Sequence, residues 1–149
     1  MSVRELGQAV VARVWVHLKP LGFKRRSAMF LRDGPQLGER YAIHGSPWNS
    51  GSEPWDFSVS VGLFFPDLAP FPTAKGFWKY CHAVGDAVHI TSECPERFQV
   101  SAGDVDLVSS QVIEAILSAS DALPNLAPAV RERARQGLIS PLPVPETWI

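Results

Sequence analysis

Cysteine and histidine are the residue types in this chain that could build a metal centre. The chain has two cysteines and four histidines, and one stretch holds four of them: Cys81, His82, His89 and Cys94. Zinc needs thiolates and neutral imidazoles that converge tetrahedrally, usually from short paired spacings such as C-x₂-C. If the segment is a strand, the adjacent Cys81 and His82 point to opposite faces. The pattern favours a buried cysteine beside an ordinary histidine, so we predict neither a metal nor another cofactor.

Nucleophilic catalysis is the second chemistry that these residues could perform, with Cys81 as nucleophile and His82 or His44 as base. It needs a thiolate activated by a nearby imidazole and a third group that orients the base. The residue types are present, but their spacing does not predict that they converge. The chain has no serine-hydrolase elbow, no G-x-G-x-x-G and no Walker motif. We therefore predict no catalytic residues, and a small enzyme with a Cys/His pocket is the alternative.

A run of three basic residues, Lys24-Arg25-Arg26, could contact the phosphates of a nucleic acid. The formal net charge of the chain is −1, however, and a nucleic-acid-binding face normally gathers more cations. Three charges at a helix-to-strand turn are more typical of a solvated edge, where they also block pairing with another sheet. We expect no nucleic-acid partner.

Aromatic residues concentrate between residues 48 and 78, and they are the strongest indication of a binding surface. Many of them will complete the core, but tryptophan is also enriched at the hot spots of interfaces. The loop 46–54 is polar and glycine-bearing, and tryptophans lie within it and directly after it. The candidate binding residues are Ser46, Trp48, Asn49, Trp55 and Phe64. We interpret them as a surface that docks another protein.

The strand that follows this loop shows the clearest periodicity in the chain. Large apolar residues alternate with small or polar ones: Phe57, Val59, Val61 and Leu63 against Asp56, Ser58, Ser60 and Gly62. A period of two predicts a strand over 55–65 with one buried and one open face. Two further strands are predicted at 28–32 and 40–44. The connecting loops are too short for a helical crossover, so the three strands must run antiparallel.

Helices are predicted at both ends of the chain. Ser2 and Glu5 fit a capping box, and apolar residues then recur at steps of three and four. A second helix should begin at Asp104 or Asp106, and Pro124 should end it. A third helix should run from about residue 125 to 136.

The remaining segments carry weaker signals. Residues 74–84 fit either a short helix or an irregular aromatic stretch, while 88–91 and 97–100 resemble short strands. Residues 138–149 form a proline-rich extended tail. The expected fold is α+β, with an antiparallel sheet of about four to five strands packed against N-terminal and C-terminal helices.

Length and composition indicate one globular domain over 1–149. The chain is 46% hydrophobic and 19% charged, which suits a buried core. The N-terminus carries no secretory signal, and no stretch approaches the roughly 18 apolar residues of a membrane span. We expect a cytoplasmic protein with reduced thiols and no membrane partner. A free sheet edge or the tail could pair two copies into a homo-oligomer.

Several short motifs occur in a recognisable order along residues 1–130. They are Leu21-Gly22-Phe23-Lys24-Arg25-Arg26 with Phe30-x-Arg32, Ser46-x-Trp48-Asn49, Phe57-x-Val59-x-Val61-Gly62, Cys81-His82 with Gly85, and Leu123-Pro124-x-Leu126. Together they resemble the bacterial domain-of-unknown-function 4304 family, whose members often have Gln where this chain has Gly45. The resemblance implies a small bacterial α+β protein with no agreed activity. Some such proteins resemble immunity proteins of toxin systems, so we expect a non-catalytic protein-binding domain.

Overall fold

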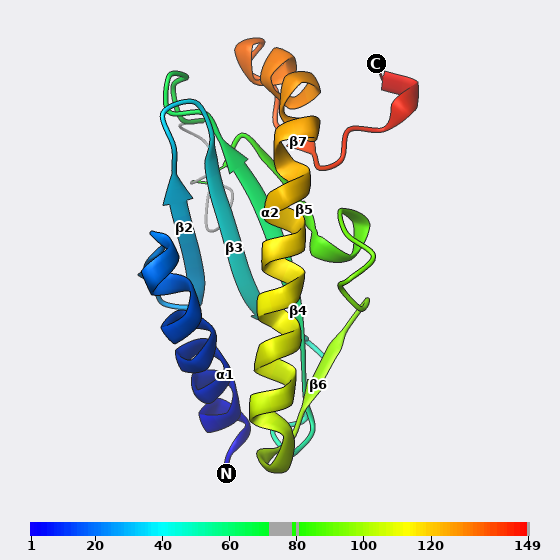
Figure 1. Ribbon diagram of the computed structural model, residues 1–149. Coiled ribbons are helices and arrows are strands. Elements are labelled where there is room, and N and C mark those ends of the chain that lie inside the picture. The colour runs from blue at the N-terminus through cyan, green and yellow to red at the C-terminus, as the bar shows by residue number, and fades with distance from the viewer. Residues whose placement is uncertain (72–78, 80, 149) are drawn as a thin grey trace.

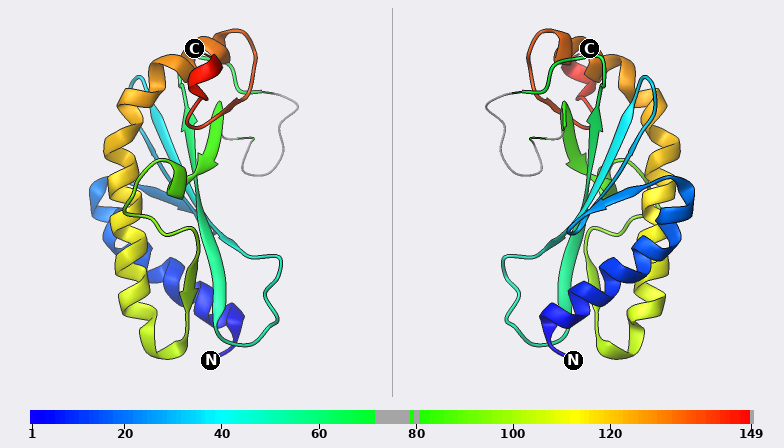
Figure 2. Two further views of the ribbon diagram at one scale, coloured as in Figure 1. Left: turned by 90° about the vertical axis from the view of Figure 1, so that its right-hand side faces the viewer. Right: turned by 90° about the vertical axis from the view of Figure 1, so that its left-hand side faces the viewer.

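Two helices, α1 (Val3–Leu18) and α2 (Val105–Arg135), cover one face of a single β-sheet in the computed structural model (Figure 1). The structure describes residues 1–71, 79 and 81–148. Figure 2 shows that both helices lie on the same side of the sheet and that the two ends of the chain lie at opposite ends of the molecule. Most of the ambiguous segment 74–84 falls outside the described residues.

Helix α1 forms where the capping box predicts it. The Ser2 hydroxyl accepts the Glu5 amide proton at 3.1 Å, and the Glu5 carboxylate accepts the Ser2 amide proton at 3.3 Å. The apolar stripe is fully buried: Leu6, Val10, Val14 and Leu18. After a short 3₁₀ turn the chain leaves through Gly22, whose φ of 93° is a left-handed conformation that favours glycine.

Within the residues that the structure describes, the sheet has seven strands, which is more than the four to five predicted. They are β1 Lys24–Arg26, β2 Met29–Asp33, β3 Gly38–Gly45, β4 Trp55–Phe64, β5 Ala83–Asp86, β6 Phe98–Val100 and β7 Ser140–Pro141. Strand β4 is central, since β3 pairs with one of its edges and both β5 and β6 pair with the other. All pairs are antiparallel except β5 with β7.

The predicted alternation of β4 is confirmed on its helix-facing side. Its large apolar side chains are buried against the helices: Phe57, Val59, Val61 and Leu63. On the other face Ser58 and Ser60 are half-buried, whereas Gly62 is buried against the Cys81 side chain. The second face is therefore open over the part of the strand nearest the loop 46–54.

The predicted break at Pro124 is wrong, because α2 continues through Pro124 and Pro128 to Arg135 as one helix. A proline removes one helical hydrogen bond and crowds the preceding turn. Both prolines lie on the exposed flank of α2, where water can bond the carbonyl groups that lose their amide donors. Burial of Leu123 and Val130 on the opposite flank holds the helix against the sheet.

Three shorter predictions also need correction. Residues Ala87–His89 form a 3₁₀ helix where 88–91 resembles a strand. The Ala87 carbonyl accepts the amide protons of Ile90 and Thr91, each at 3.0 Å, and this turn overrides the β propensity of the side chains. The basic triplet 24–26 does not form a turn. It forms strand β1, which is the charged edge of the sheet. The tail contains β7 and a 3₁₀ turn at Glu146–Trp148, so it packs against the body.

The architecture is thus α+β with a mostly antiparallel sheet, as predicted. In the part of the chain that the structure describes, neither long helix has the length and hydropathy needed to cross a bilayer.

Candidate functional site

The loop 46–54 has a backbone that is tied to the neighbouring strand. The side-chain amide of Asn49 bonds both backbone groups of Asp56: its Nδ2 donates to the Asp56 carbonyl at 2.7 Å, and its Oδ1 accepts the Asp56 amide proton at 2.8 Å. The Ser46 amide also donates to the Asp56 carbonyl at 2.9 Å. At the far end, the Glu53 carboxylate accepts the Ala102 amide proton at 2.5 Å. These contacts fasten the loop to β4 at its beginning and to the turn before α2 at its end.

Trp48 is a large apolar side chain in this mostly exposed loop. Its side chain is 86% exposed, and its amide donates to the Ser46 hydroxyl at 3.2 Å. Figure 2 shows the loop projecting from the side of the sheet opposite to the helices, at the end near the N-terminus. The residues around Trp48 therefore fix its backbone and leave its indole in solvent.

Trp55 lies on the other side of the sheet. Its ring stacks on Phe57 with centroids 4.9 Å apart. Its ring atoms also lie within 3.4 Å of the positions that side chains at Gly7 and Gly45 would occupy, so glycine at both positions makes room for the indole. Trp55 is a half-buried neighbour of α1 rather than a partner of Trp48.

Phe64 lies at the opposite end of β4 from Trp55. The two are nine positions apart along an extended strand, which is about 30 Å. The Phe64 ring stacks on His82 with centroids 4.8 Å apart, and the Arg40 guanidinium lies 5.2 Å from the ring centroid. The five candidate residues therefore do not form one site: Ser46, Trp48 and Asn49 lie together in the loop, and Trp55 and Phe64 lie elsewhere.

Two residues outside the predicted set, Glu53 of the loop and Asp56 of β4, also fix the loop. Glu53 anchors the loop to a residue 49 positions away in the chain, and a contact of that range leaves no local signal. Asp56 bonds Asn49 through its backbone carbonyl and amide, and a pattern of side chains does not reveal backbone contacts.

The two cysteines are free and buried, in agreement with the predicted reduced thiols. Burial raises the pKa of Cys81 to about 12 and that of Cys94 to about 11. A catalytic cysteine needs a lowered thiol pKa. Both thiols are instead protonated at neutral pH, which counts against either as a nucleophile.

His82 is fully buried, and both of its ring nitrogens are engaged. Nδ1 accepts the Phe65 amide proton at 2.9 Å, which places the ring proton on Nε2, and Nε2 donates to the Ala69 carbonyl at 2.9 Å. Its ring also stacks on Phe64 and Phe65. His82 thus fixes residues 65–69, directly after β4, and has no nitrogen left for a base or a metal ligand.

His44 does not join this cluster. His44 pairs with Ser58 of β4. Arg40, four positions before His44 on β3, lies beside Gly62, as the Cys81 side chain does. That offset is about 13 Å. Burial lowers the pKa of His44, with an opposing effect from Asp86. Within the described residues, no group of three or more His, Cys, Asp or Glu side chains is placed to hold a metal ion.

Comparisons with protein-family models, with curated proteins and with solved structures found no match to this chain.

Proposed function

We propose that this chain is a small, non-catalytic protein-binding domain of the bacterial cytoplasm that docks its partner through Trp48, in the manner of an immunity protein. The observation that supports this proposal is the contrast between the fixed backbone of the loop and the exposure of the Trp48 indole. Because the loop already fixes the backbone that carries this side chain, docking costs less conformational entropy than it would from a free loop. Tryptophan is typical of an interface hot spot.

The sheet face next to the loop extends the proposed surface. A shallow hollow of about 340 Å³ lies there, at the ends of β1, β2 and β3. Its lining is mostly apolar: Arg26, Ser27, Ala28, Met29, Ala42, Ile43 and His44. His44 is two residues from Ser46, so the hollow adjoins the base of the Trp48 loop. A partner that packs on Trp48 would cover both.

The experiment is a binding measurement with the purified product of the neighbouring gene. The unchanged chain and the variants Trp48→Ala and Trp148→Ala are titrated by calorimetry. Trp148 is a suitable control because it is 56% exposed and belongs to the C-terminal tail. We expect Trp48→Ala to weaken binding by about 2 kcal/mol or more, or roughly 30-fold, and Trp148→Ala to leave it unchanged. Absence of binding by the unchanged chain, or equal affinity of Trp48→Ala, would refute the proposal.

The resemblance to the domain-of-unknown-function 4304 family agrees with this proposal but stays a prediction. It fits a small binding domain whose loop 46–54 carries the Ser46-x-Trp48-Asn49 motif. The family contributes no residue role of its own here, so the proposal depends on the exposure and anchoring of Trp48.

A further inference from the structure

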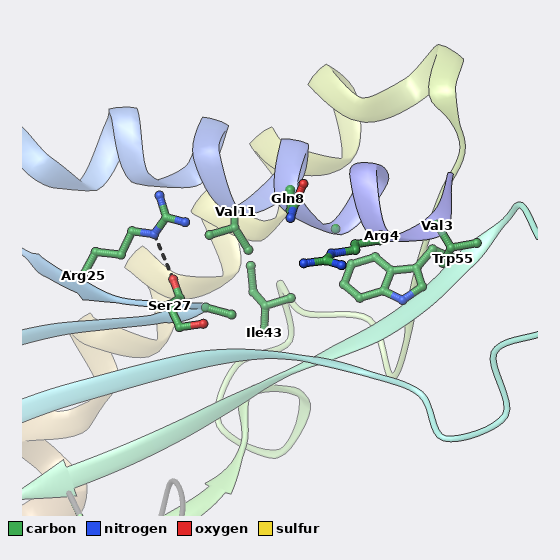
Figure 3. Close-up of a pocket in the computed structure, with 10 residues that line it drawn as sticks. Val3, Arg4, Gln8, Val11, Arg25, Ser27, Ile43 and Trp55 are labelled. Carbon is green, nitrogen blue, oxygen red and sulfur yellow. Dashed lines mark hydrogen bonds between the residues drawn. The ribbon is translucent and has the colours of Figure 1, made fainter. Parts of the chain in front are cut away.

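A groove separates the first half of α1 from the end of the sheet beneath it (Figure 3). Its volume is about 500 Å³, which lies within the range of small-molecule sites. The residues that line it, which we call the α1 groove, are Val3, Arg4, Gly7, Gln8, Val11, Arg25, Ser27, Ala28, Ile43 and Trp55. It lies on the helix side of the sheet, whereas the loop 46–54 projects from the other side.

One flank of α1 forms the wall of the groove. Arg4, Gln8 and Val11 follow the i, i+4, i+7 spacing that places residues above one another on a helix. Their span is about 10 Å along the helix axis. The neighbouring stripe, which includes Leu6 and Val10, packs in the core, and Val11 is also a core residue of which 6% is exposed. Arg4 and Gln8 are the exposed members of this flank, and Val11 contributes a small apolar surface to the floor of the groove.

The middle of the groove is apolar and its two ends are polar. Figure 3 shows Val11 and Ile43 between Arg25 at one end and Arg4 with Trp55 at the other. Ile43 is buried and Trp55 is half-buried. A ligand that fits this arrangement has an apolar body about as long as the groove and a charged group at an end.

The charge of that group follows from the two arginines. No acidic side chain lines the groove, and among the described residues neither Arg4 nor Arg25 makes an ion pair. Arginines elsewhere pair with carboxylates: Arg13, Arg32, Arg40, Arg97, Arg131 and Arg135. The residues that line the groove thus carry a net positive charge, which complements an anion.

The Arg25 guanidinium is oriented by a hydrogen bond that leaves it able to bind such an anion. Its Nε donates to the Ser27 carbonyl at 2.8 Å, which leaves the terminal nitrogens free for a carboxylate. Ser27 itself has a φ of 52°, in the left-handed region that disfavours residues other than glycine. A strained, non-glycine turn at the rim of a cavity is the kind of feature that accompanies binding sites.

We propose that the α1 groove binds a small organic carboxylate with an apolar body, whose carboxylate pairs with Arg25 and whose body lies on Val11, Ile43 and Trp55. Arg4 adds a second positive charge at the other end. This site is separate from the proposed docking surface around Trp48.

The test is an NMR titration of the ¹⁵N-labelled full chain with 4-phenylbutyrate and with its neutral counterpart, 4-phenylbutyramide. The two probes have the same apolar body, and only one carries a charge. We expect the carboxylate to shift the Trp55 indole N–H signal and the Val11 and Ile43 amide signals, with at least tenfold tighter binding than the amide. The Trp55→Phe variant identifies the indole signal.

Charge-matched variants then locate the carboxylate. Arg25→Gln should weaken 4-phenylbutyrate binding at least tenfold. The affinity of Arg25→Lys should lie between those of Arg25→Gln and the unchanged chain, because lysine keeps the positive charge but lacks the paired N–H donors of the guanidinium. Lys24→Gln is the matched control, since Lys24 is adjacent on β1, points to the opposite face and does not line the groove. It should change the affinity less than twofold.

Several results would overturn the proposal: no binding at 10 mM probe, equal binding of carboxylate and amide, an equal effect of Lys24→Gln and Arg25→Gln, or signal shifts confined to residues outside the groove. A retained ¹H–¹⁵N spectrum of Arg25→Gln shows that this variant is folded, so its loss of binding can be attributed to the guanidinium.

Discussion

Arg32 of β2 and Arg25 of β1 lie on neighbouring strands, and their surroundings differ. Arg32 belongs to a polar network between the sheet and α2. Its Nε donates to Glu39 at 2.9 Å and its Nη2 to Ser120 at 3.1 Å, while the Tyr41 hydroxyl donates to Glu39 at 2.6 Å. The Ser120 hydroxyl also donates to Glu39. Every member of this network has a protein partner.

Arg25 has one bond to a backbone carbonyl and faces a groove without acidic residues. The same residue type therefore serves two purposes in one sheet. Where the partners are supplied within the chain, the arginine fastens a helix to the sheet. Where they are not supplied, it can bind a ligand, and its removal should cost little stability. The following predictions test this difference between the network and the groove.

Loss of Glu39 should have the largest effect. Glu39→Ala leaves the Arg32 guanidinium, the Tyr41 hydroxyl and the Ser120 hydroxyl without their shared acceptor, and the Glu39 side chain is only 13% exposed. We expect the free energy of unfolding to fall by about 3 kcal/mol. Urea denaturation measures this change. A loss no greater than that of Arg25→Gln would remove the distinction between the two regions.

High pH should weaken the network through Tyr41. Burial, and next the charge of Glu39, raise the pKa of Tyr41 above its usual value near 10. The folded state then keeps the phenol protonated while the unfolded state ionises it, so this contribution is complete below pH 10 and is lost as the pH rises further. The expected loss is about 1.4 kcal/mol per pH unit above 10.

The control for this pH effect is Tyr41→Phe, because both buried thiols also ionise on unfolding in this range. The difference in pH slope between the unchanged chain and Tyr41→Phe isolates the phenol. Equal slopes from pH 9 to pH 11 would contradict the assignment.

At the rim of the groove, Ser27→Gly should raise stability. Glycine adopts the φ of 52° without the penalty that serine has there. We expect a gain of about 1 kcal/mol in the free energy of unfolding, measured by urea denaturation. Ala28, the other turn residue, has no positive φ, so Ala28→Gly serves as the control and should not stabilise the chain.

The smallest change is expected for Arg25→Gln. Arg25 is exposed and makes no ion pair in the described part of the chain, so its removal should alter the free energy of unfolding by no more than about 0.5 kcal/mol. The same variant should lose 4-phenylbutyrate. A large loss of stability would show that Arg25, like Arg32, stabilises the fold.

Much of the fold could be predicted because its signals are local. The capping box of α1 and the period of two in β4 involve residues within a few positions of one another, and both predictions are confirmed. The prediction that α2 ends at Pro124 is wrong because a contact distant in sequence outweighs a local preference. The local preference of Pro124 is to end a helix, but packing of the buried flank of α2 outweighs that preference.

The candidate site was predictable only in part. Ser46, Trp48 and Asn49 do lie together, because they are close in sequence and form one loop. Trp55 is seven residues from Trp48, yet its ring packs beside α1 and Phe57, whereas the loop that carries Trp48 projects from the other side of the sheet. The α1 groove was missed because its arginines are distant in sequence, and Arg25 was interpreted only as part of a basic edge.

From residue types and spacing alone, the chain specifies its α+β class, the register of its apolar faces and the boundaries of its best-capped helix. These properties depend on backbone geometry that repeats every two or 3.6 residues. The pairing of polar side chains has no such period along the sequence. Glu39 meets Ser120 across 81 positions, and the groove arginines meet no carboxylate in the described chain. Folding in three dimensions settles those pairings, because the free energy of a charge depends on what surrounds it rather than on its neighbours along the chain.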